Sequence, residues 1–141
     1  MSAPTRKLAY SIAAISLLAF SAGLLVVGSA AATDADIPDV NPMSGDERAI
    51  KEGRSWFRGI CSSCHGEGAS SRNAPVDLRK FNKGFRQFVL TVKNGRQVSG
   101  RPQYMPAWRT VLADEQIYQI GAYLETLALP EANWKEPVNS P

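Results

Sequence analysis

The sequence has few side chains that could bind a metal through nitrogen or sulfur. Its 141 residues include one histidine, two cysteines and three methionines. A structural zinc site needs four ligands and a catalytic one needs three plus water, so carboxylates would have to complete any zinc site here. The chain also lacks internal repeats and any composition typical of disorder, collagen or a protein with several membrane spans. The length suits one compact domain.

Long apolar runs are absent except at the N-terminus. There Arg6 and Lys7 precede the apolar stretch from Leu8 to Val27, and small residues follow as far as Ala32. This order predicts a secretory signal peptide over residues 1–32, cleaved after Ala31 or Ala32, and therefore a periplasmic protein. The alternative is an uncleaved anchor in the inner membrane, because about 20 apolar residues can span a bilayer. Both interpretations place the folded part outside the cytoplasm.

The remainder divides into a linker over residues 33–43, a domain over 44–129 and a mostly polar tail over 130–141. Ser44 and Glu47 have the spacing of a capping box and predict a first helix that runs to about Ile60.

Two further helices are predicted from apolar residues at helical spacing. One lies around Phe85–Val92 and stops at Asn94-Gly95, and the other closes the domain around Ile117–Leu127. The segment Arg96–Pro106 is expected to be a loop, because glycine and proline interrupt it. The fold class is therefore all-α, with no sheet.

Two glycines interrupt helix interiors, where glycine costs about 0.5 to 1 kcal/mol relative to alanine. Gly53 and Gly121 both lie on the apolar face of their helices. They predict that the first and last helices cross there with their backbones close together.

The strongest motif is Cys61-Ser62-Ser63-Cys64-His65, the CxxCH signal for covalent attachment of haem. Two thiols three residues apart on a helical turn face the same side, where each can add to one vinyl group of a haem. His65 follows directly and is placed to reach the iron. Three other uses of the cysteines are a thioredoxin-like redox pair, which needs a preceding strand, a zinc site, and a plain disulfide. None of the three accounts for the motif as well as haem attachment does.

The second axial ligand of such a haem cannot be another histidine, because the chain has only one. Methionine, lysine, water or an empty position remain. Of the methionines after the signal, Met43 lies in the linker, whereas Met105 lies in a proline-bracketed loop 40 residues after His65. Met105 is the better candidate, and its alternative role is that of a buried gap-filler.

Taken together, the motifs resemble those of class I cytochromes c over about Ser44 to Leu129. The matching motifs, in the family's order, are Gly53-x-x-x-Phe57, the CxxCH sequence, Asn94-Gly95, Met105-Pro106-Ala107-Trp108 and Tyr123-Leu124. The resemblance implies a small all-α fold around one haem c, with His65 and Met105 as axial ligands of the iron.

The resemblance also implies that the carbonyl of Pro75 accepts the second ring hydrogen of His65. Two positions depart from the family pattern, namely Asn73-Ala74-Pro75 in place of Gly-Pro and Ala113 in place of a serine or threonine helix cap. The methionine loop and the tryptophan in the tail are further similar to those of the electron acceptors of periplasmic quinoprotein alcohol dehydrogenases.

Charge is distributed unevenly along the chain. Residues 54–109 contain eleven lysines or arginines against Glu67 and Asp77, whereas residues 33–53 and 110–141 each sum to −4. Because both predicted haem-binding loops lie in the basic segment, we expect a positive ring near the haem edge that steers acidic redox partners. Nucleic acid is excluded as a partner by the predicted compartment and by aromatic residues that follow the core stripes.

These features predict a monomeric electron carrier that is not an enzyme, because six-coordinate haem leaves no open position for a substrate. A gas-binding or peroxidatic haem protein is the alternative if Met105 does not bind the iron. A third possibility is a haem subunit of a larger dehydrogenase or oxidase, with Tyr104, Trp108 or Trp134 at the contact.

Overall fold

The structure is a computed structural model that describes residues 34–71, 74, 76–97, 99–100 and 104–135. The predicted signal peptide, residues 1–32, and Pro75 lie outside the described residues. None of the helices in the described ranges is long and apolar enough to cross a membrane. The elements, in chain order, are η1 (Asp34–Asp36), α1 (Glu47–Trp56), the π-helical turn η2 (Phe57–Cys61), α2 (Ser62–His65), η3 (Leu78–Lys80), α3 (Gly84–Asn94), β1 (Arg96–Gln97), β2 (Tyr104–Met105) and α4 (Asp114–Glu125).

Helix α1 begins two residues later than the capping-box spacing predicts. The residue that caps it is Asp46, whose carboxylate accepts the Ala49 backbone N–H at 2.7 Å. Ser44 instead donates its hydroxyl hydrogen to the carboxylate of Glu125 near the end of α4. The predicted capping box was therefore wrong, because Asp46 lies directly before the first helical residue and reaches the free N–H groups better.

The first helix also does not stop near Ile60. The π-helical turn η2 joins α1 directly to α2, so helical backbone runs without a break from Glu47 to His65. It ends at Gly66, which has a positive φ of 76° and donates its N–H to the Ser62 carbonyl at 2.8 Å. Glycine adopts this conformation without steric cost and is the usual residue at such an end. The CxxCH motif consequently forms the last turn of a continuous helical segment.

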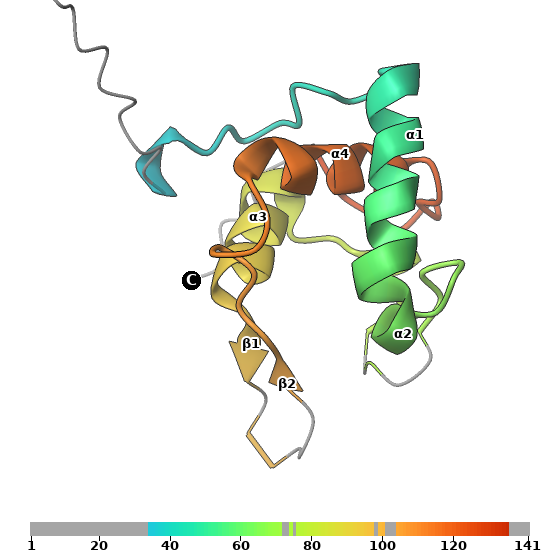
Figure 1. Ribbon diagram of the computed structural model, residues 1–141. Helices are drawn as coiled ribbons and strands as arrows, with labels where there is room; N and C mark the ends of the chain where they lie inside the picture. The colour runs from blue at the N-terminus through green and yellow to red at the C-terminus, as the bar shows by residue number, and fades with distance from the viewer. Residues whose placement is uncertain (1–33, 72–73, 75, 98, 101–103, 136–141) are drawn as a thin grey trace, which may run out of the picture. The chain divides into compact units, whose positions relative to one another are not determined.

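Helices α1 and α4 cross with their backbones in contact, as Gly53 predicted (Figure 1). A Cβ atom built on Gly53 would lie 1.8 Å from the Gln119 carbonyl oxygen, so no larger residue fits without separating the helices. Beside this point the indole of Trp56 donates to the Gln119 side chain at 3.1 Å.

The prediction for Gly121 was wrong. A Cβ atom there would meet the Phe85 ring at 2.9 Å, the Asn41 amide at 3.1 Å and the Phe88 ring at 3.3 Å. Gly121 therefore faces α3 and the N-terminal segment rather than α1. It lets the two phenylalanine rings of α3 lie directly against the backbone of α4.

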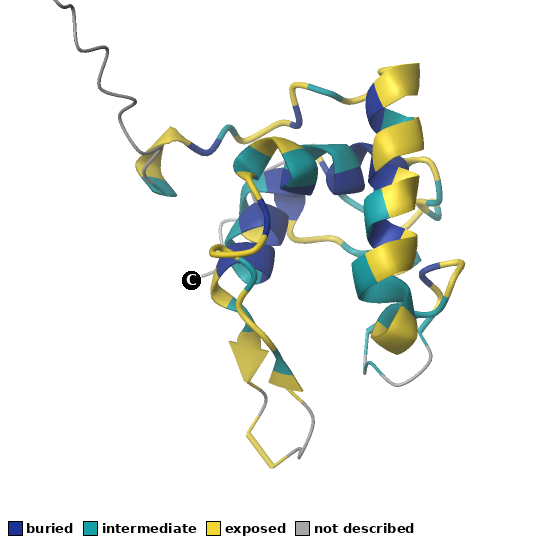
Figure 2. Ribbon diagram, in the orientation of Figure 1, coloured by how far each residue is buried: buried dark blue, intermediate teal, exposed yellow. Residues whose placement is uncertain are grey.

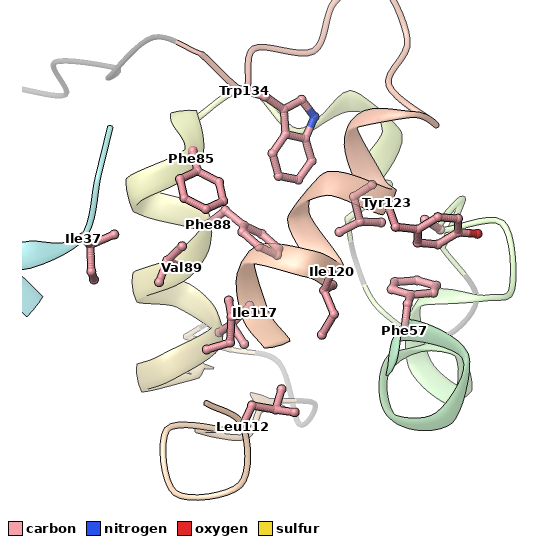
Figure 3. Close-up of a cluster of buried hydrophobic side chains, with 13 residues drawn as sticks. Ile37, Phe57, Phe85, Phe88, Val89, Leu112, Ile117, Ile120, Tyr123 and Trp134 are labelled. Carbon is pink, nitrogen blue, oxygen red and sulfur yellow. The ribbon is translucent and has the colours of Figure 1, made fainter. Parts of the chain in front are cut away.

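The apolar core fills the space among α1, α3 and α4 (Figure 3). Phe57 and Tyr123 connect α1 to α4 with ring centroids 5.6 Å apart, while Phe88 contacts Trp134 from the C-terminal segment at 5.2 Å. The buried faces of α3 and α4 are turned inward, whereas the β1–β2 ribbon is largely exposed (Figure 2). The other members are Ile37, Ala69, Phe85, Val89, Val92, Leu112, Ile117, Ile120 and Leu124.

The absence of a sheet was also predicted wrongly. Arg96–Gln97 pair antiparallel with Tyr104–Met105, and Arg96 lies opposite Met105. The prediction of a loop depended on glycine and proline, which end helices but also form the turns of hairpins. A ribbon with two residues on each side is too short to leave an alternating pattern in the sequence.

Both flanks of the predicted domain take part in the packing. In the segment predicted as a linker, Ile37 is 1% exposed, and Asn41 is buried and donates to the Tyr118 carbonyl at 3.0 Å. In the predicted tail, Trp134 is 5% exposed. Flanks of this kind have no helical period, so the periodicity that predicted limits at residues 44 and 129 could not include them.

Replacing Gly53 by alanine should destabilise the fold strongly. The added methyl group would overlap the Gln119 carbonyl, and we expect the free energy of unfolding to fall by about 3 kcal/mol. Gly59→Ala is the matched control, because a Cβ atom on Gly59 meets nothing within 4 Å. Denaturant unfolding of the two variants checks this, and equal stabilities would show that α1 and α4 do not meet at Gly53.

Candidate functional site

The CxxCH residues are presented by the last turn of the long helical segment. Cys61 ends η2, and Cys64 and His65 lie in α2. Both cysteines are free thiols, so the alternative of a disulfide between them is not what the structure contains. A helix rather than a strand precedes the motif, which also argues against a thioredoxin-like redox pair.

The two thiols differ in their surroundings. Burial, with a smaller contribution from the neighbouring Cys64, raises the pKa of the Cys61 thiol to about 11. The Cys64 side chain is exposed. The Cys61 thiol is therefore not set up as a reactive thiolate near neutral pH, which would require a lowered pKa.

His65 is set up as a neutral ligand. Burial lowers the pKa of its imidazole, so one ring nitrogen keeps a free lone pair at neutral pH. Its Nδ1 atom is buried and has no hydrogen-bond partner among the described residues. A buried ring nitrogen without a partner is unusual in native proteins and marks a position where a further group is expected.

The loop after α2 folds back onto the motif. Ser71 donates its backbone N–H to the His65 carbonyl, and Ala74 donates to the Cys64 carbonyl, both at 3.0 Å. Ala69 and Ser71 adopt positive φ angles of 58° and 75°, which non-glycine residues rarely do. Such backbone strain persists only where the surroundings hold it, and it is common at functional sites. Pro75, the predicted acceptor for His65, follows Ala74 directly but lies outside the described residues.

Met105 lies on β2 and is partly buried. It packs against the same core cluster as Cys61, and so do Leu78, Phe81 and Trp108. In Figure 1, α2 and β2 both lie below α4. Met43 precedes α1, and the helical segment from Glu47 to His65 separates it from the motif by roughly 27 Å at 1.5 Å per residue. Of the two methionines, Met105 is therefore the one that packs against the same core cluster as the motif.

The backbone around Met105 is held against the end of α3. Gly95 has a positive φ of 73°, and a Cβ atom on it would lie 2.5 Å from the Met105 carbonyl oxygen and 2.8 Å from the Ala107 nitrogen. Trp108 donates its backbone N–H to the Val92 carbonyl in the last turn of α3 at 3.0 Å. The methionine loop, residues 104–109, is therefore anchored at both ends.

About half of the described basic side chains in this segment are paired within the fold, which alters the expected positive ring. Arg72 and Arg101 lie outside the described residues, and five of the other nine basic side chains form ion pairs. These pairs are Arg79–Asp77, Lys80–Glu131, Arg86–Asp39, Lys93 with Asp34 and Asp114, and Arg109–Asp34. Most of the acidic partners come from the two flanks, so the sequence asymmetry reflects internal pairing as much as surface charge.

One exposed cation remains beside Met105. Arg96, opposite Met105 in the ribbon, has no ion pair with an acidic residue that the structure describes. Two large apolar side chains are exposed nearby along the chain, Tyr104 at 66% and Val111 at 61%. Sequence analysis missed this grouping, because it depends on the ribbon that brings Arg96 next to Met105.

The described residues do not support a zinc site. No group of three or more histidine, cysteine, aspartate or glutamate side chains in that part of the chain could hold a metal ion. The donor set that the fold offers is instead two thiols on one helical turn, a neutral imidazole beside them, and the partly buried thioether of Met105 on β2. This set fits a covalently attached haem and supplies no tetrahedral metal cage.

Comparison with known proteins points to one family. Residues 48–124 match the family model for cytochrome c oxidase, cbb3-type, subunit III. Cytochrome c550 of Pseudomonas aeruginosa is 30% identical over 97 residues, which cover 67% of this chain and 66% of that protein. Cytochrome c6 of Anabaena variabilis is 31% identical over 83 residues, which cover 59% of this chain and 94% of that protein.

A similar fold is found in the crystal structure of cytochrome CL from the marine methylotrophic bacterium Methylophaga aminisulfidivorans. The TM-score is 0.54 at 26% identity, over 63% of this chain and 59% of that one. The match therefore spans just under two thirds of cytochrome c550 and less of cytochrome CL. The small helical fold class predicted from the sequence is confirmed by these matches.

Replacing Gly95 by alanine should weaken the attachment of the methionine loop. Gly100→Ala is the control, because Gly100 also has a positive φ, of 77°, but nothing within 4 Å of an added Cβ. Both variants place an alanine at a positive φ, which costs about 1 to 3 kcal/mol. Only Gly95→Ala should lose about 2 kcal/mol more through its contact with the Met105 and Ala107 backbone. Thermal unfolding monitored by circular dichroism measures the difference, and identical losses would exclude the contact.

Proposed function

Because the chain belongs to the cytochrome c family, whose members hold haem c covalently, we propose that it carries single electrons between redox proteins through one haem bound at Cys61, Cys64 and His65. The observation that supports this best is the placement of the three residues on one helical turn. When bound, the haem supplies a one-electron couple at its iron.

The chain's own residues attach, orient and shield that group. The two thiols each form a thioether bond to a vinyl group, and the long helical segment that presents them keeps their spacing. The imidazole of His65 is kept neutral by burial and supplies a nitrogen ligand. We assign the carbonyl of Pro75 as the acceptor of the N–H on the ring nitrogen that does not bind the iron, which would increase the basicity of the ligand. The hydrogen bond from Ala74 to the Cys64 carbonyl brings that segment next to the motif.

Met105 supplies the second axial ligand in this proposal. It is partly buried at the core, whereas Met43 lies at the far end of the helical segment. A thioether raises the reduction potential of a haem relative to two nitrogen ligands. With both axial positions filled, no position is open for a substrate, so the protein is a carrier rather than an enzyme.

Visible spectra of the exported protein test this assignment. Wild-type protein should show the weak long-wavelength ferric band of sulfur ligation and a ferrous spectrum that carbon monoxide leaves unchanged. Met105→Ala should lose the band and bind carbon monoxide promptly, because it opens one axial position. Met43→Leu is the control and should behave as wild type.

Either of two results would contradict the proposal. Prompt binding of carbon monoxide to the wild type would favour a gas-binding or peroxidatic haem protein. A sulfur band that disappears in Met43→Leu and persists in Met105→Ala would reverse the assignment of the ligand.

We further propose that the protein works in the periplasm, between a quinoprotein alcohol dehydrogenase and a terminal oxidase. The apolar run Leu8–Val27 behind two basic residues supports export. The sequence of the methionine loop and the similarity to cytochrome CL from a methylotrophic bacterium support the donor. The family model, described as subunit III of an oxidase, favours a second candidate, a haem subunit bound to an oxidase. Co-purification from periplasm at low and high salt separates the two, since only a loosely held carrier dissociates as salt rises.

The surface around Met105 is the docking face in this proposal. It combines Arg96, which has no ion pair among the described residues, with exposed Tyr104 and Val111, which suits an acidic partner with an apolar contact.

Arg96→Gln should therefore slow electron transfer from the partner at low ionic strength. We expect the second-order rate constant to fall about threefold, through weaker electrostatic steering. Lys51→Gln removes the same charge from an exposed position on α1 and should have a smaller effect. The difference should vanish at high salt, where steering is screened. Stopped-flow reduction measures the rates, and equal slowing in both variants would indicate that net charge alone matters.

A further inference from the structure

A cluster of charged side chains joins the N-terminal segment to the base of the methionine loop. One carboxylate oxygen of Asp34 accepts from the Arg109 guanidinium at 3.0 Å, and the other lies 3.4 Å from the Lys93 amino group. Lys93 also binds Asp114 at the start of α4 at 2.9 Å, and Arg109 also donates to the Asn94 side chain at 2.5 Å. Asp34 is thus the one acidic group that touches both cations in the described part of the chain.

The cluster is partly shielded from water. The Lys93 side chain is only 7% exposed, while those of Asp34 and Arg109 are 41% and 45% exposed. Burial alone would lower the pKa of Lys93, but its hydrogen bonds and charge interactions with Asp114 and Asp34 raise it overall. The hydrogen bond from Arg109 is the main cause that lowers the pKa of Asp34. Both pKa shifts favour the charged forms of Lys93 and Asp34, and removing the Asp34 carboxylate would leave Arg109 without an anionic partner among the described residues.

Arg109 is the last residue of the methionine loop, four residues after Met105. Its backbone N–H donates to the Lys93 carbonyl at 3.3 Å, next to the bond from Trp108 to Val92. The guanidinium and the backbone of one residue are thus both fixed at the end of α3. A change at Asp34 is transmitted to the loop through this single residue.

We propose that Asp34 is a positioning residue for Met105: it anchors the methionine loop through Arg109 and so strengthens the bond between the thioether and the haem iron. The inference rests on the proposed function, in which Met105 binds the iron. It assigns a role in the redox site to a segment that precedes the first long helix and that sequence analysis treated as a linker.

The test measures the pH at which ferric protein loses the long-wavelength sulfur band on alkalinisation. Asp34→Asn keeps the size of the side chain and removes its charge. A loop that opens more easily gives up its ligand at lower pH, so the midpoint should fall by about half a pH unit, a roughly threefold change in the opening equilibrium. Arg109→Gln should give a similar shift, and the double variant should add little to either single change.

Asp39→Asn is the matched control. Asp39 binds Arg86 at 2.8 Å, so it ties the same N-terminal segment to the same helix, α3, through an aspartate–arginine pair. Arg86 lies near the start of α3 and far along the chain from the methionine loop. Asp39→Asn should therefore change thermal stability about as much as Asp34→Asn and leave the midpoint pH unchanged.

The outcomes separate the two proposals. A wild-type protein without the sulfur band overturns methionine ligation itself. A wild type that shows the band, with equal midpoints in Asp34→Asn and wild type, overturns the role of Asp34 alone. Equal shifts in Asp34→Asn and Asp39→Asn would also overturn it, since the effect would then come from general loosening of the N-terminal segment.

Discussion

The fold depends on the direct contact between the backbones of α1 and α4 at Gly53. A side chain at this position would overlap the Gln119 carbonyl. The two helices can cross this closely only because residue 53 is a glycine. Around it, Trp56 is hydrogen bonded to Gln119 and Phe57 packs on Tyr123, which fixes how α1 is rotated about its axis. Because helical backbone continues from α1 to His65, that rotation also sets the direction in which the CxxCH residues point.

Two other glycines extend this constraint to the opposite side of the site. Gly121 lets the Phe85 and Phe88 rings of α3 lie against the backbone of α4, and Gly95 lets the chain after α3 lie against the backbone at Met105. Three close contacts thus connect the attachment motif to the methionine through α1, α4 and α3 in turn. In each contact the neighbouring segment lies directly against the glycine backbone, with no flexible side chain between the two. Such contacts leave little freedom for the distance between the two predicted iron ligands.

The sequence predicted those features of the structure that leave a signal within a short stretch of the chain. The three long helices, the crossing at Gly53 and the helical setting of the cysteines were predicted, because apolar period, glycine and motif spacing are all local signals. The capping residue was missed by two positions, since Ser44 and Asp46 are both good caps and only the fold shows that Ser44 binds Glu125. The role of Gly121 and the β1–β2 ribbon were missed because both depend on contacts between segments distant in sequence. Met105 was selected over Met43 by loop length, and the helical segment that separates Met43 from the motif supports that choice.

The charge pattern of the sequence could also have predicted ion pairs between the flanks and the middle segment. An acidic N-terminal segment, a basic middle and an acidic C-terminal part predict a positive surface near the haem, yet opposite charges in one small domain also attract each other. Asp34, Asp39 and Glu131 all bind cations of the middle segment. Exposed pairs of this kind each add little stability. Their larger effect is on recognition, because they cancel the long-range field that would steer a partner. Among the described residues, Arg96 has no ion pair and lies opposite Met105, next to the exposed side chain of Tyr104, a combination that favours brief, small-area contacts of the kind redox proteins make.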